Sequence, residues 1–307
     1  MRIFKDWNWV DPGARGASVA MGNFDGLHIG HQRVIDIARS KGPLGLVTFE
    51  PHPRQVFQPQ APSFRLMNAE ARANRLAKFG VQTLFELPFN KLLMSMDPDQ
   101  FAATVLEAGL GVSHVVVGAD FCFGKGRTGD VGDLQRLGKR HGFEVTIADL
   151  VMDGDREVSS TEIRAALAQG EPRKAAAMLG HLHRIEGEVI HGEKRGRELG
   201  YPTANMSVAG LHIPKFGVYA VKVDVLSGPH EGSYLGAASL GVRPQFGGEV
   251  PNLETFFFDF KGDLYGHHLS VALVEYLRPE MKFDGLPGLL TQMAADCLQA
   301  RSILAAA

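Results

Sequence analysis

The chain has 307 residues, a length at which about two domains of ordinary size are expected. Hydrophobic residues make up 45% and charged residues 21%, and the formal net charge is -2, so an extended nucleic-acid surface is not expected. The N-terminus lacks the apolar core of a signal peptide, no run approaches a membrane span, and the two cysteines have no metal or disulfide spacing. These features predict a cytoplasmic protein that binds small molecules, with no membrane or nucleic-acid partner, and they leave the oligomeric state open.

Strand and helix patterns alternate along the first half of the chain. Apolar runs rich in Val predict five strands, at residues 18–21, 44–49, 81–87, 114–119 and 143–148. Helical spacing of apolar residues predicts helices between them, at residues 31–41, 69–80, 97–110 and 131–142. This alternation is typical of an α/β fold with a doubly wound parallel sheet, which we expect over residues 1–183.

The second half has a different texture, with short strands separated by Gly and Pro. The strand patterns lie at residues 183–192, 217–226, 232–241, 252–260 and 269–277, without helical patterns between them. Such spacing predicts a small antiparallel β-barrel or sandwich over residues 184–307. The last stretch, residues 286–306, has helical periodicity and predicts a C-terminal helix.

The stretch from Met21 to Gln32, MGNFDGLHIGHQ, connects a predicted strand to a predicted helix. A glycine-bearing turn there places backbone N–H groups and the positive end of a helix at the carboxyl edge of the sheet, where anions bind. The pattern matches neither a dinucleotide fingerprint nor a P-loop. His28 and His31, three residues apart, would face the same way and donate hydrogen bonds to a phosphate. Taken alone, such a pair is more often a polar helix start.

A second helix start follows at the sequence VSSTEIR, residues 158–164. Ser159 and Glu162 have the spacing of a capping box, which places Ser160, Thr161 and Arg164 in or near the first turn of a helix. Free N–H groups at that turn would bind a second phosphate. The alternative is a helix start with no ligand.

In the second half, a glycine-rich basic turn at residues 192–200 leads into Thr203 and Asn205. Residues i and i+2 of an extended chain point the same way, so the hydroxyl and amide oxygens of this pair could share one cation. Oxygen ligands of this kind suit Mg²⁺. The basic residues of such a turn are, in the ordinary case, only a solvated surface.

The run NLETFFFDF, residues 252–260, combines a carboxylate with aromatic residues. Alternation predicts that Glu254 shares one face with Phe256, Phe258 and Phe260. A carboxylate at the mouth of such a face suits a general base for an alcohol. A strand-end glutamate turned to solvent is an equally good interpretation of this stretch alone.

The first half resembles the FAD synthetase family. The resemblance rests on GNFDGLHIGH, TFEPHPRQVF, VVGADFCFGKGRTGD and VSSTEIR, in that order. It implies a Rossmann-like nucleotidylyltransferase domain in which His28 and His31 are catalytic. The implied ATP- and phosphate-binding residues are Gly22, Asn23, Phe24, Asp25, Gly30, Ser160, Thr161 and Arg164. The implied flavin-side residues are Pro51, His52, Pro53, Asp120 and Phe123. Many members carry a basic residue where this chain has Glu162, so Arg164 would supply the charge there.

The second half resembles the riboflavin kinase module through GRELGYPTAN and LETFFFDF. The resemblance implies that Thr203 and Asn205 bind magnesium and that Glu254 is the catalytic base. It also implies an ATP-binding set, which is Gly192, Lys194, Gly196, Arg197 and Pro202. The loop ASLGVRPQFGG departs from the commoner family form at Ser239, Val242 and Gln245.

Two such modules in this order resemble the bacterial bifunctional riboflavin kinase and FAD synthetase family. The resemblance implies ATP-dependent phosphorylation of riboflavin to FMN with Mg²⁺, and then adenylylation of FMN to FAD with release of pyrophosphate. Two alternatives are an enzyme with only one active module and a flavin- or nucleotide-binding regulator without turnover. An assay with riboflavin, ATP and magnesium separates the three.

Overall fold

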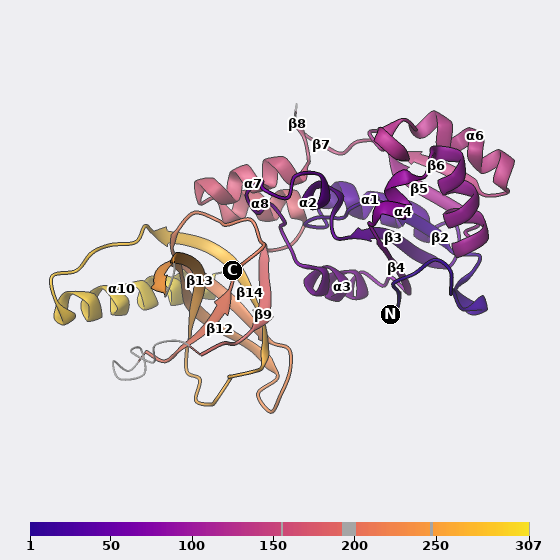
Figure 1. The fold of residues 1–307 in the computed structure, drawn as a ribbon. Helices are drawn as coiled ribbons and strands as arrows, with labels where there is room; N and C mark the ends of the chain where they lie inside the picture. Colours follow the sequence, from indigo (N-terminus) through magenta and orange to yellow (C-terminus); the bar gives the residue numbers. More distant parts are fainter. Residues whose placement is uncertain (155, 192–200, 246–247, 307) are drawn as a thin grey trace. The chain divides into compact units, whose positions relative to one another are not determined.

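The computed structural model describes the whole chain except residues 155, 192–200, 246–247 and 307 (Figure 1). It divides into two compact units. Unit 1 comprises Met1–Ala61 and Arg72–Val158, and unit 2 comprises Pro62–Ala71 and Ser159–Ala307. The boundary expected after residue 183 lies inside unit 2, so the division of the two activities at that point stays a prediction.

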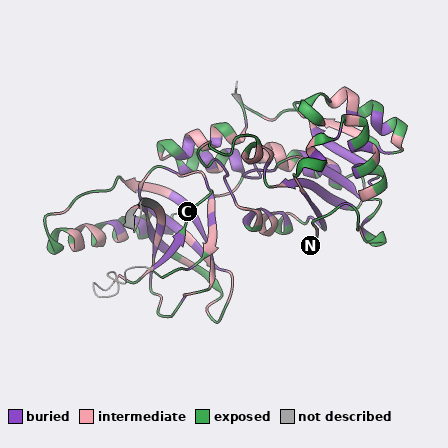
Figure 2. Ribbon diagram, in the orientation of Figure 1, coloured by how far each residue is buried: buried purple, intermediate pink, exposed green. Residues whose placement is uncertain are grey.

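A six-stranded sheet of parallel strands forms the centre of unit 1. The strands are β1 (Arg2–Phe4), β2 (Ser18–Met21), β3 (Leu44–Glu50), β4 (Thr83–Pro88), β5 (His114–Gly118) and β6 (Glu144–Ala148). Their spatial order is β1-β4-β3-β2-β5-β6. The central strands are buried along nearly their whole length (Figure 2), as expected of parallel strands with helices on both faces.

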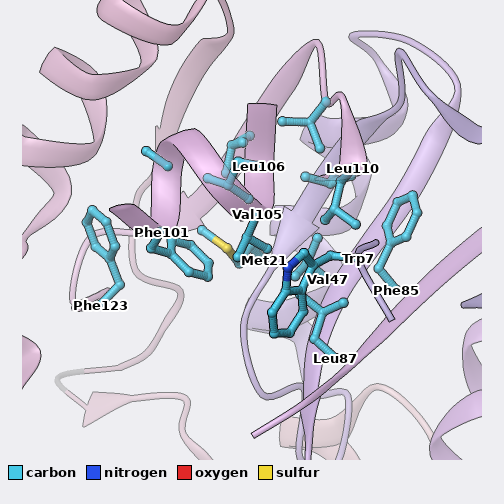
Figure 3. Close-up of a cluster of buried hydrophobic side chains, with 14 of the residues drawn as sticks. Trp7, Met21, Val47, Phe85, Leu87, Phe101, Val105, Leu106, Leu110 and Phe123 are labelled. Atoms are coloured by element: carbon cyan, nitrogen blue, oxygen red, sulfur yellow. The ribbon is translucent and has the colours of Figure 1, made fainter. Parts of the chain in front are cut away.

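Helices cover both faces of this sheet. On one face α1 (Ile29–Arg39) contacts β2, β3 and β5. On the other lie η2 (Phe101–Leu110), wound as a π-helix, and α6 (Val131–His141). The side chains packed there include Trp7, Met21, Val47, Phe85, Leu87, Phe101, Val105, Leu106, Leu110 and Phe123 (Figure 3). The expected doubly wound α/β fold is confirmed.

Shorter elements complete the chain up to residue 180. They are η1 (Pro12–Ala14), α2 (Pro53–Phe57), α3 (Ala69–Lys78), α4 (Lys91–Ser95), α5 (Pro98–Gln100), η3 (Lys125–Arg127), β7 (Met152–Asp153), β8 (Arg156–Glu157), α7 (Ser160–Gln169) and α8 (Pro172–Leu179). Many helix starts have a side-chain cap that the sequence encodes locally. Asp97 and Asp130, for example, each accept a hydrogen bond from the backbone N–H three residues ahead.

Unit 2 contains a six-stranded antiparallel sheet in the order β10-β13-β12-β11-β14-β9. The strands are β9 (Arg184–Glu188), β10 (Thr203–Ser207), β11 (Gly217–Val225), β12 (Gly232–Gln245), β13 (Gly248–Phe257) and β14 (His268–Arg278). A bridge between Ile190 and Asn205 joins the two edges and nearly closes a barrel. The barrel interior is apolar, with Met206, Leu240 and Leu253 fully buried. The expected barrel is therefore confirmed, and β10 is an additional strand.

The predicted C-terminal helix is α10 (Leu286–Ala305), and it packs on the outer surface of the barrel. Ala300 and Leu304 contact an apolar cluster that includes Ala237 and Phe258. A salt bridge between Asp296 on the helix and Arg278 on β14, at 2.7 Å, holds one part of the helix. Arg301 reaches Asp259 at 2.8 Å and lies over the ring of Phe258. In the described residues, neither α10 nor another helix is long and apolar enough to span a bilayer.

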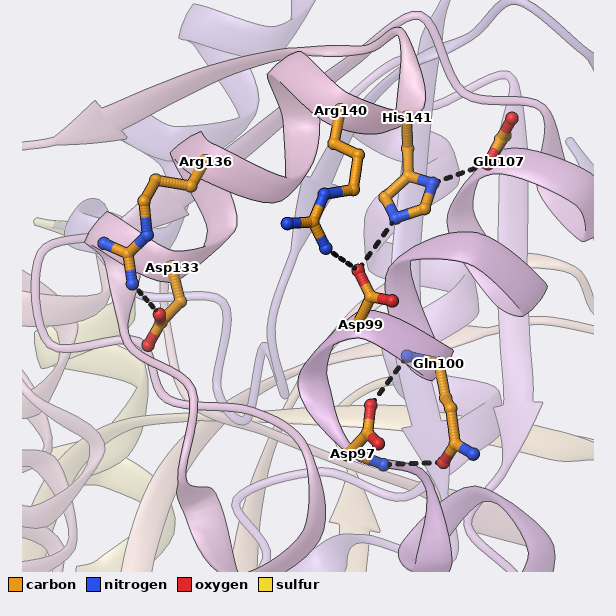
Figure 4. Close-up of polar contacts among 8 residues, drawn as sticks. All are labelled: Asp97, Asp99, Gln100, Glu107, Asp133, Arg136, Arg140 and His141. Atoms are coloured by element: carbon orange, nitrogen blue, oxygen red, sulfur yellow. Dashed lines mark hydrogen bonds and ion pairs between the residues drawn. The ribbon is translucent and has the colours of Figure 1, made fainter.

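A cluster of charged side chains ties α6 to the segments before it (Figure 4). The Nε2 atom of His141 lies 3.1 Å from Asp99, and its Nδ1 atom lies 2.8 Å from Glu107. Arg140 donates to the same Asp99 carboxylate at 2.8 Å. Hydrogen bonds to the two carboxylates raise the pKa of His141, and those from His141 and Arg140 lower the pKa of Asp99.

These shifts predict a pH-dependent contribution to stability. Because the pKa of His141 is raised by folding, its contribution is complete below the ordinary histidine pKa and is lost as pH rises through the folded value. The stability that His141→Gln removes, measured as a fall in Tm, should therefore be larger at pH 5.5 than at pH 9. In an NMR titration, Asp99→Asn should bring the pKa of His141 back toward its ordinary value. An unchanged titration would contradict this account.

Candidate active sites

The first candidate site lies at the carboxyl edge of the parallel sheet in unit 1. From β2 the chain moves to β3 on one side, and it later returns to β5 on the other. Strand order thus reverses at β2, and ligands of open α/β sheets bind at the carboxyl ends of strands at such a reversal. The loops that follow β2, β3 and β5 all emerge at this edge, and they carry most of the residues that the sequence singled out in unit 1.

The turn after β2 is held in an uncommon backbone conformation. Phe24, Gly26 and Leu27 have φ angles of 53°, 82° and 49°. Left-handed conformations are unfavourable for Phe and Leu, yet both side chains are almost fully buried, so core packing holds the turn in place. Local strain of this kind is typical of functional sites.

The two histidines lie side by side at the start of α1. His28 is the N-cap residue, and its Nδ1 atom accepts a hydrogen bond from the backbone N–H of His31 at 3.4 Å. The two rings stack with centroids 3.6 Å apart. A Cβ atom at Gly30 would lie 3.1 Å from the His28 ring, so glycine allows this close approach. The histidines face the same way, as expected, but His28 lies just before the helix instead of within it.

The environment of the pair determines its protonation. Burial, and to a smaller extent the charge of His28, hold the pKa of His31 well below its ordinary value. His31 is therefore neutral near pH 7, and its Nδ1 atom is buried with no hydrogen-bond partner among the described residues. Because Nδ1 of His28 accepts the hydrogen bond from the His31 backbone, only its Nε2 atom can donate an N–H group to a ligand. A bound anion would raise the pKa of His31 and strengthen its imidazole as a donor.

Other predicted phosphate-binding residues lie in the same turn. Gly22 donates its N–H to the carbonyl of Val47 at 3.1 Å, which attaches the turn to β3. The side chain of Asp25 is buried, whereas Asn23 is exposed and accepts a hydrogen bond from Thr48 through its backbone carbonyl. Ligand contacts from these residues stay a prediction.

The predicted flavin-side residues occupy different environments: one caps a helix, one is buried in the core and one is exposed in a loop. His52 caps α2 and accepts a hydrogen bond from the N–H of Arg54 at 3.1 Å. It lies between Pro51, which follows the last residue of β3, and Pro53, in the first turn of α2. Phe123 is buried in the core (Figure 3), so little of its ring is open to a ligand. Asp120 is exposed in the loop after β5.

Sequence reasoning missed one aromatic side chain in this region. Phe57 ends α2 and is 62% exposed, and its ring lies edge-on to that of Phe89 at 5.7 Å. An exposed phenylalanine held against a second ring offers a face on which a planar ligand can stack. The sequence feature that indicated Phe57 was its position four residues after Pro53, one of the predicted flavin-side residues.

The second predicted phosphate-binding segment begins α7. Ser159 is the N-cap and its hydroxyl accepts a hydrogen bond from the N–H of Glu162 at 3.3 Å. Ser160 and Thr161 are the first helical residues, as expected. Arg164 contacts the carbonyl of Phe64 and the hydroxyl of Thr161, both at 3.3 Å. These residues belong to unit 2 by their contacts, so their membership of the first site stays a prediction.

The second candidate site lies on the outer face of the barrel in unit 2. In the register of β10 with β13, Asn205 lies directly opposite Glu254, and Thr203 opposite Phe256. Residues opposite each other in an antiparallel pair project from the same face of the sheet. Thr203, Asn205 and Glu254 therefore share one face, although Glu254 is distant from the other two in the sequence.

Hydrogen bonds orient the Asn205 amide. Its Oδ1 atom accepts from the side chain of Asn252 at 2.8 Å, and its Nδ2 atom donates to the carbonyl of Thr203 at 3.4 Å. The hydroxyl of Thr203, the amide oxygen of Asn205 and the half-buried carboxylate of Glu254 form a set of oxygen donors on this face. Such a set fits Mg²⁺, which binds one or two protein oxygens and completes its shell with water and substrate phosphates.

The aromatic alternation expected after Glu254 is only partly correct. Phe256 and Phe258 pack in the cluster beneath α10, with ring centroids 6.0 Å apart. Asp259 then adopts a left-handed conformation, with φ at 57°, and turns the chain. Phe260 consequently packs with Phe257 and the barrel cluster, and the expectation that it shares a face with Glu254 is wrong.

A cavity of about 260 Å³ opens beside Thr203. Its walls are mainly apolar, with Lys261 and Asp263 as charged residues, and Pro202 is part of its lining. The other predicted ATP-binding residues of this site are Gly192, Lys194, Gly196 and Arg197, which lie outside the described residues.

The three positions at which β12 departs from the commoner family form differ in their distance from Glu254. Ser239 lies directly opposite Glu254, and its side chain shares that face. Val242 pairs with Pro251 farther along the strand, and Gln245 ends β12. A second carboxylate also reaches this region, because an oxygen of Glu280 occupies the space that a Cβ atom at Gly241 would need.

Comparison with known proteins yields matches to both halves. The FAD synthetase family model matches residues 11–162, and the riboflavin kinase family model matches residues 179–304. A bifunctional riboflavin kinase/FMN adenylyltransferase from Pseudomonas fluorescens is 40% identical, over 99% of this chain and 98% of its own length. Proteins of the same name from Listeria monocytogenes and Escherichia coli are 37% and 35% identical, over 94% and 93% of this chain and 92% of their own lengths.

A solved structure also resembles the chain. A crystal structure described as a macrolide-efflux protein from Streptococcus pneumoniae matches with a TM-score of 0.81 and 32% identity, over 96% of both chains. The similarity extends across both units, so the two proteins share their folds. The macrolide-efflux description refers to the Streptococcus protein only. The two family models and the curated relatives all have names that refer to flavin phosphorylation or adenylylation.

Proposed function

Because the chain belongs to the family of bifunctional riboflavin kinases/FMN adenylyltransferases, we propose that it makes FAD from riboflavin in two steps. The first step transfers the γ-phosphoryl group of ATP to the 5′-hydroxyl of riboflavin and yields FMN and ADP. The second transfers the adenylyl group of another ATP to the phosphate of FMN and yields FAD and pyrophosphate. The observation that carries this division is the presence of two unlike sites, a stacked histidine pair in unit 1 and a carboxylate opposite an asparagine in unit 2.

The kinase step needs a base, and Glu254 is the proposed one. The ribityl hydroxyl is a weak nucleophile until a proton is removed as it attacks phosphorus. Glu254 projects from the same face as Thr203 and Asn205, which supports its role near the transferred phosphoryl group. Glu254 is half-buried, so part of the residue remains accessible from outside the barrel.

Thr203 and Asn205 would hold the magnesium ion of the kinase step. Magnesium bound there would draw negative charge from the phosphates of ATP. The protein would contribute two oxygen ligands at a constant spacing. The extended strand β10 provides this spacing, because Thr203 and Asn205 are residues i and i+2 on the same face. The adjacent cavity, with apolar walls and Pro202 in its lining, suits the adenosine part of ATP.

The adenylyl step needs no base, because the phosphate of FMN is already ionised. Its requirement is relief of the negative charge that develops around the α-phosphorus. His28 and His31 would each offer an imidazole N–H group to the phosphate, and the first turn of α1 would add backbone donors. Phe57 is the proposed stacking surface for the flavin ring, supported by its exposure.

The cytoplasmic location expected from the sequence stays a prediction.

The purified chain, incubated with riboflavin, ATP and Mg²⁺, should produce FMN and then FAD. Chromatography of the reaction mixture separates and identifies the two products. Production of FMN without FAD, or FAD only from supplied FMN, would indicate a single active module. Flavin binding with ATP left intact would indicate a regulator without turnover. Both of these outcomes would overturn the proposed function.

Replacing both His28 and His31 by alanine should abolish FAD formation while FMN still forms. Loss of one preorganised donor typically costs about 10²- to 10³-fold in rate, so the double variant should lose at least that much. His141→Gln, which removes a histidine elsewhere in unit 1, is the matched control and should retain FAD synthesis. Normal FAD formation in the double variant would contradict the assignment.

Asn205→Leu removes one proposed magnesium ligand and keeps the size of the side chain. Since changes around metal ligands already cost about 10- to 100-fold, FMN formation should fall by more than about 100-fold. FAD synthesis from supplied FMN should change little. Met206→Leu, a volume-conserving change on the inner face of the same strand, is the control. Equal loss of both reactions would point to misfolding.

Glu254→Gln keeps shape and hydrogen-bonding reach but cannot act as a base near neutral pH. FMN production should fall by about 10²- to 10⁴-fold, the usual value of general-base catalysis. The rate of FAD synthesis from FMN should stay at the parent level, measured on the same preparation with thermal melting as a folding control. Glu280→Gln tests the other carboxylate, and a larger loss there than in Glu254→Gln would move the base to Glu280.

A further inference from the structure

A half-buried asparagine on β13 lies beside the proposed magnesium pair. Asn252 precedes Glu254 by two residues, so both side chains project from the same face. Its Nδ2 atom donates to Oδ1 of Asn205 at 2.8 Å. This hydrogen bond crosses from β13 to β10 and adds to the backbone pairing of the two strands. Asn252 therefore contacts a proposed metal ligand directly.

The hydrogen bond determines which end of the Asn205 amide faces the site. An amide rotated by half a turn would present its NH₂ group, which repels a cation. Donation from Asn252 to Oδ1, and from Nδ2 of Asn205 to the carbonyl of Thr203 at 3.4 Å, both favour one rotamer. The second lone pair of Oδ1 remains for a cation.

The oxygen of Asn252 has no such partner. Its Oδ1 atom is buried, and no described residue donates a hydrogen bond to it. An acceptor buried without a donor is unfavourable, and it is most often satisfied by water or a ligand. Magnesium in proteins keeps several of its water molecules. A water bound to the cation would supply the missing donor.

Thr255 provides an internal comparison on the same strand. Its Oγ1 atom is also buried without a partner in the described chain, but Thr255 alternates to the opposite face. Leu253 and Phe257, on that face, are part of the barrel core. The two orphaned oxygens thus differ in what surrounds them, and only that of Asn252 shares a face with Glu254.

We propose that Asn252 is a positioning residue of the kinase site. Its amide N–H group holds Oδ1 of Asn205 toward the magnesium ion, and its own Oδ1 accepts a hydrogen bond from a water molecule bound to that ion. The inference rests on the proposed function of this face. It adds a residue that neither touches riboflavin nor donates a ligand atom to the metal.

Asn252→Leu in the full-length chain tests the proposal, because it removes both hydrogen bonds at similar size. The Mg²⁺ concentration for half-maximal FMN formation should rise about 10- to 100-fold, the usual effect of losing a group that orients a metal ligand. At saturating Mg²⁺ the rate should return toward that of the parent. The Mg²⁺ dependence of FAD synthesis from FMN should not change.

A measurement without turnover accompanies the kinetics. Mn²⁺ binding in the presence of ADP is measured by electron paramagnetic resonance. Asn205→Leu should abolish one population of bound Mn²⁺ ions, and Asn252→Leu should weaken the binding of that same population. Thr255→Val, which deletes the other orphaned oxygen, should leave both Mn²⁺ binding and Mg²⁺ dependence at parent values. If Asn252→Leu folds poorly, Asn252→Ser is the second variant, with the same direction expected.

The outcomes separate this inference from the proposed function. A parent protein that makes no FMN would overturn the kinase assignment itself. A parent that makes FMN, together with an Asn252→Leu variant of unchanged Mg²⁺ dependence and Mn²⁺ binding, would overturn only the role of Asn252. Equal losses in Asn252→Leu and Thr255→Val would also overturn it, because both would then reflect a weakened β13.

Discussion

The burial of Phe24 and Leu27 is the constraint on which the first site depends. Both residues hold left-handed backbone conformations, which cost free energy, and their complete burial in unit 1 offsets that cost. The turn they form brings His28 to the cap position of α1 and leaves room, at Gly30, for its ring. Without this packed turn, the ring of His28 would not be held against that of His31. The start of α1 would then be an ordinary polar helix terminus.

The second site depends on strand register. A slip of one residue between β10 and β13 would turn Asn205 or Glu254 into the barrel core, since alternate residues face opposite sides. The register is held by the apolar residues that alternate with the polar ones, among them Met206 and Leu253. The same hydrophobic packing that stabilises the barrel therefore assembles the polar face.

Under the proposed function, the sites in the two units meet different chemical requirements. Attack by a hydroxyl needs a base and a metal, and the barrel face combines a carboxylate with neutral oxygens. Attack by an ionised phosphate needs only donors for developing charge, and the proposed site in unit 1 places the imidazole of His31, held neutral by burial, beside His28 at a helix start. Keeping His31 neutral until an anion arrives fits this second task, because the gain in hydrogen bonding then comes with the ligand.

The sequence by itself determined what depends on neighbours along the chain. Apolar periodicity predicted the parallel sheet and the barrel, and the spacing of His28 and His31 predicted that they face the same way. Tertiary structure alone decided which distant residues meet. Pairing of β10 with β13 put Asn205 opposite Glu254 and in contact with Asn252, and core packing took Phe123 inward. Local patterns specify faces, but which strand lies next to which follows from burying both faces at once, a property of the whole chain.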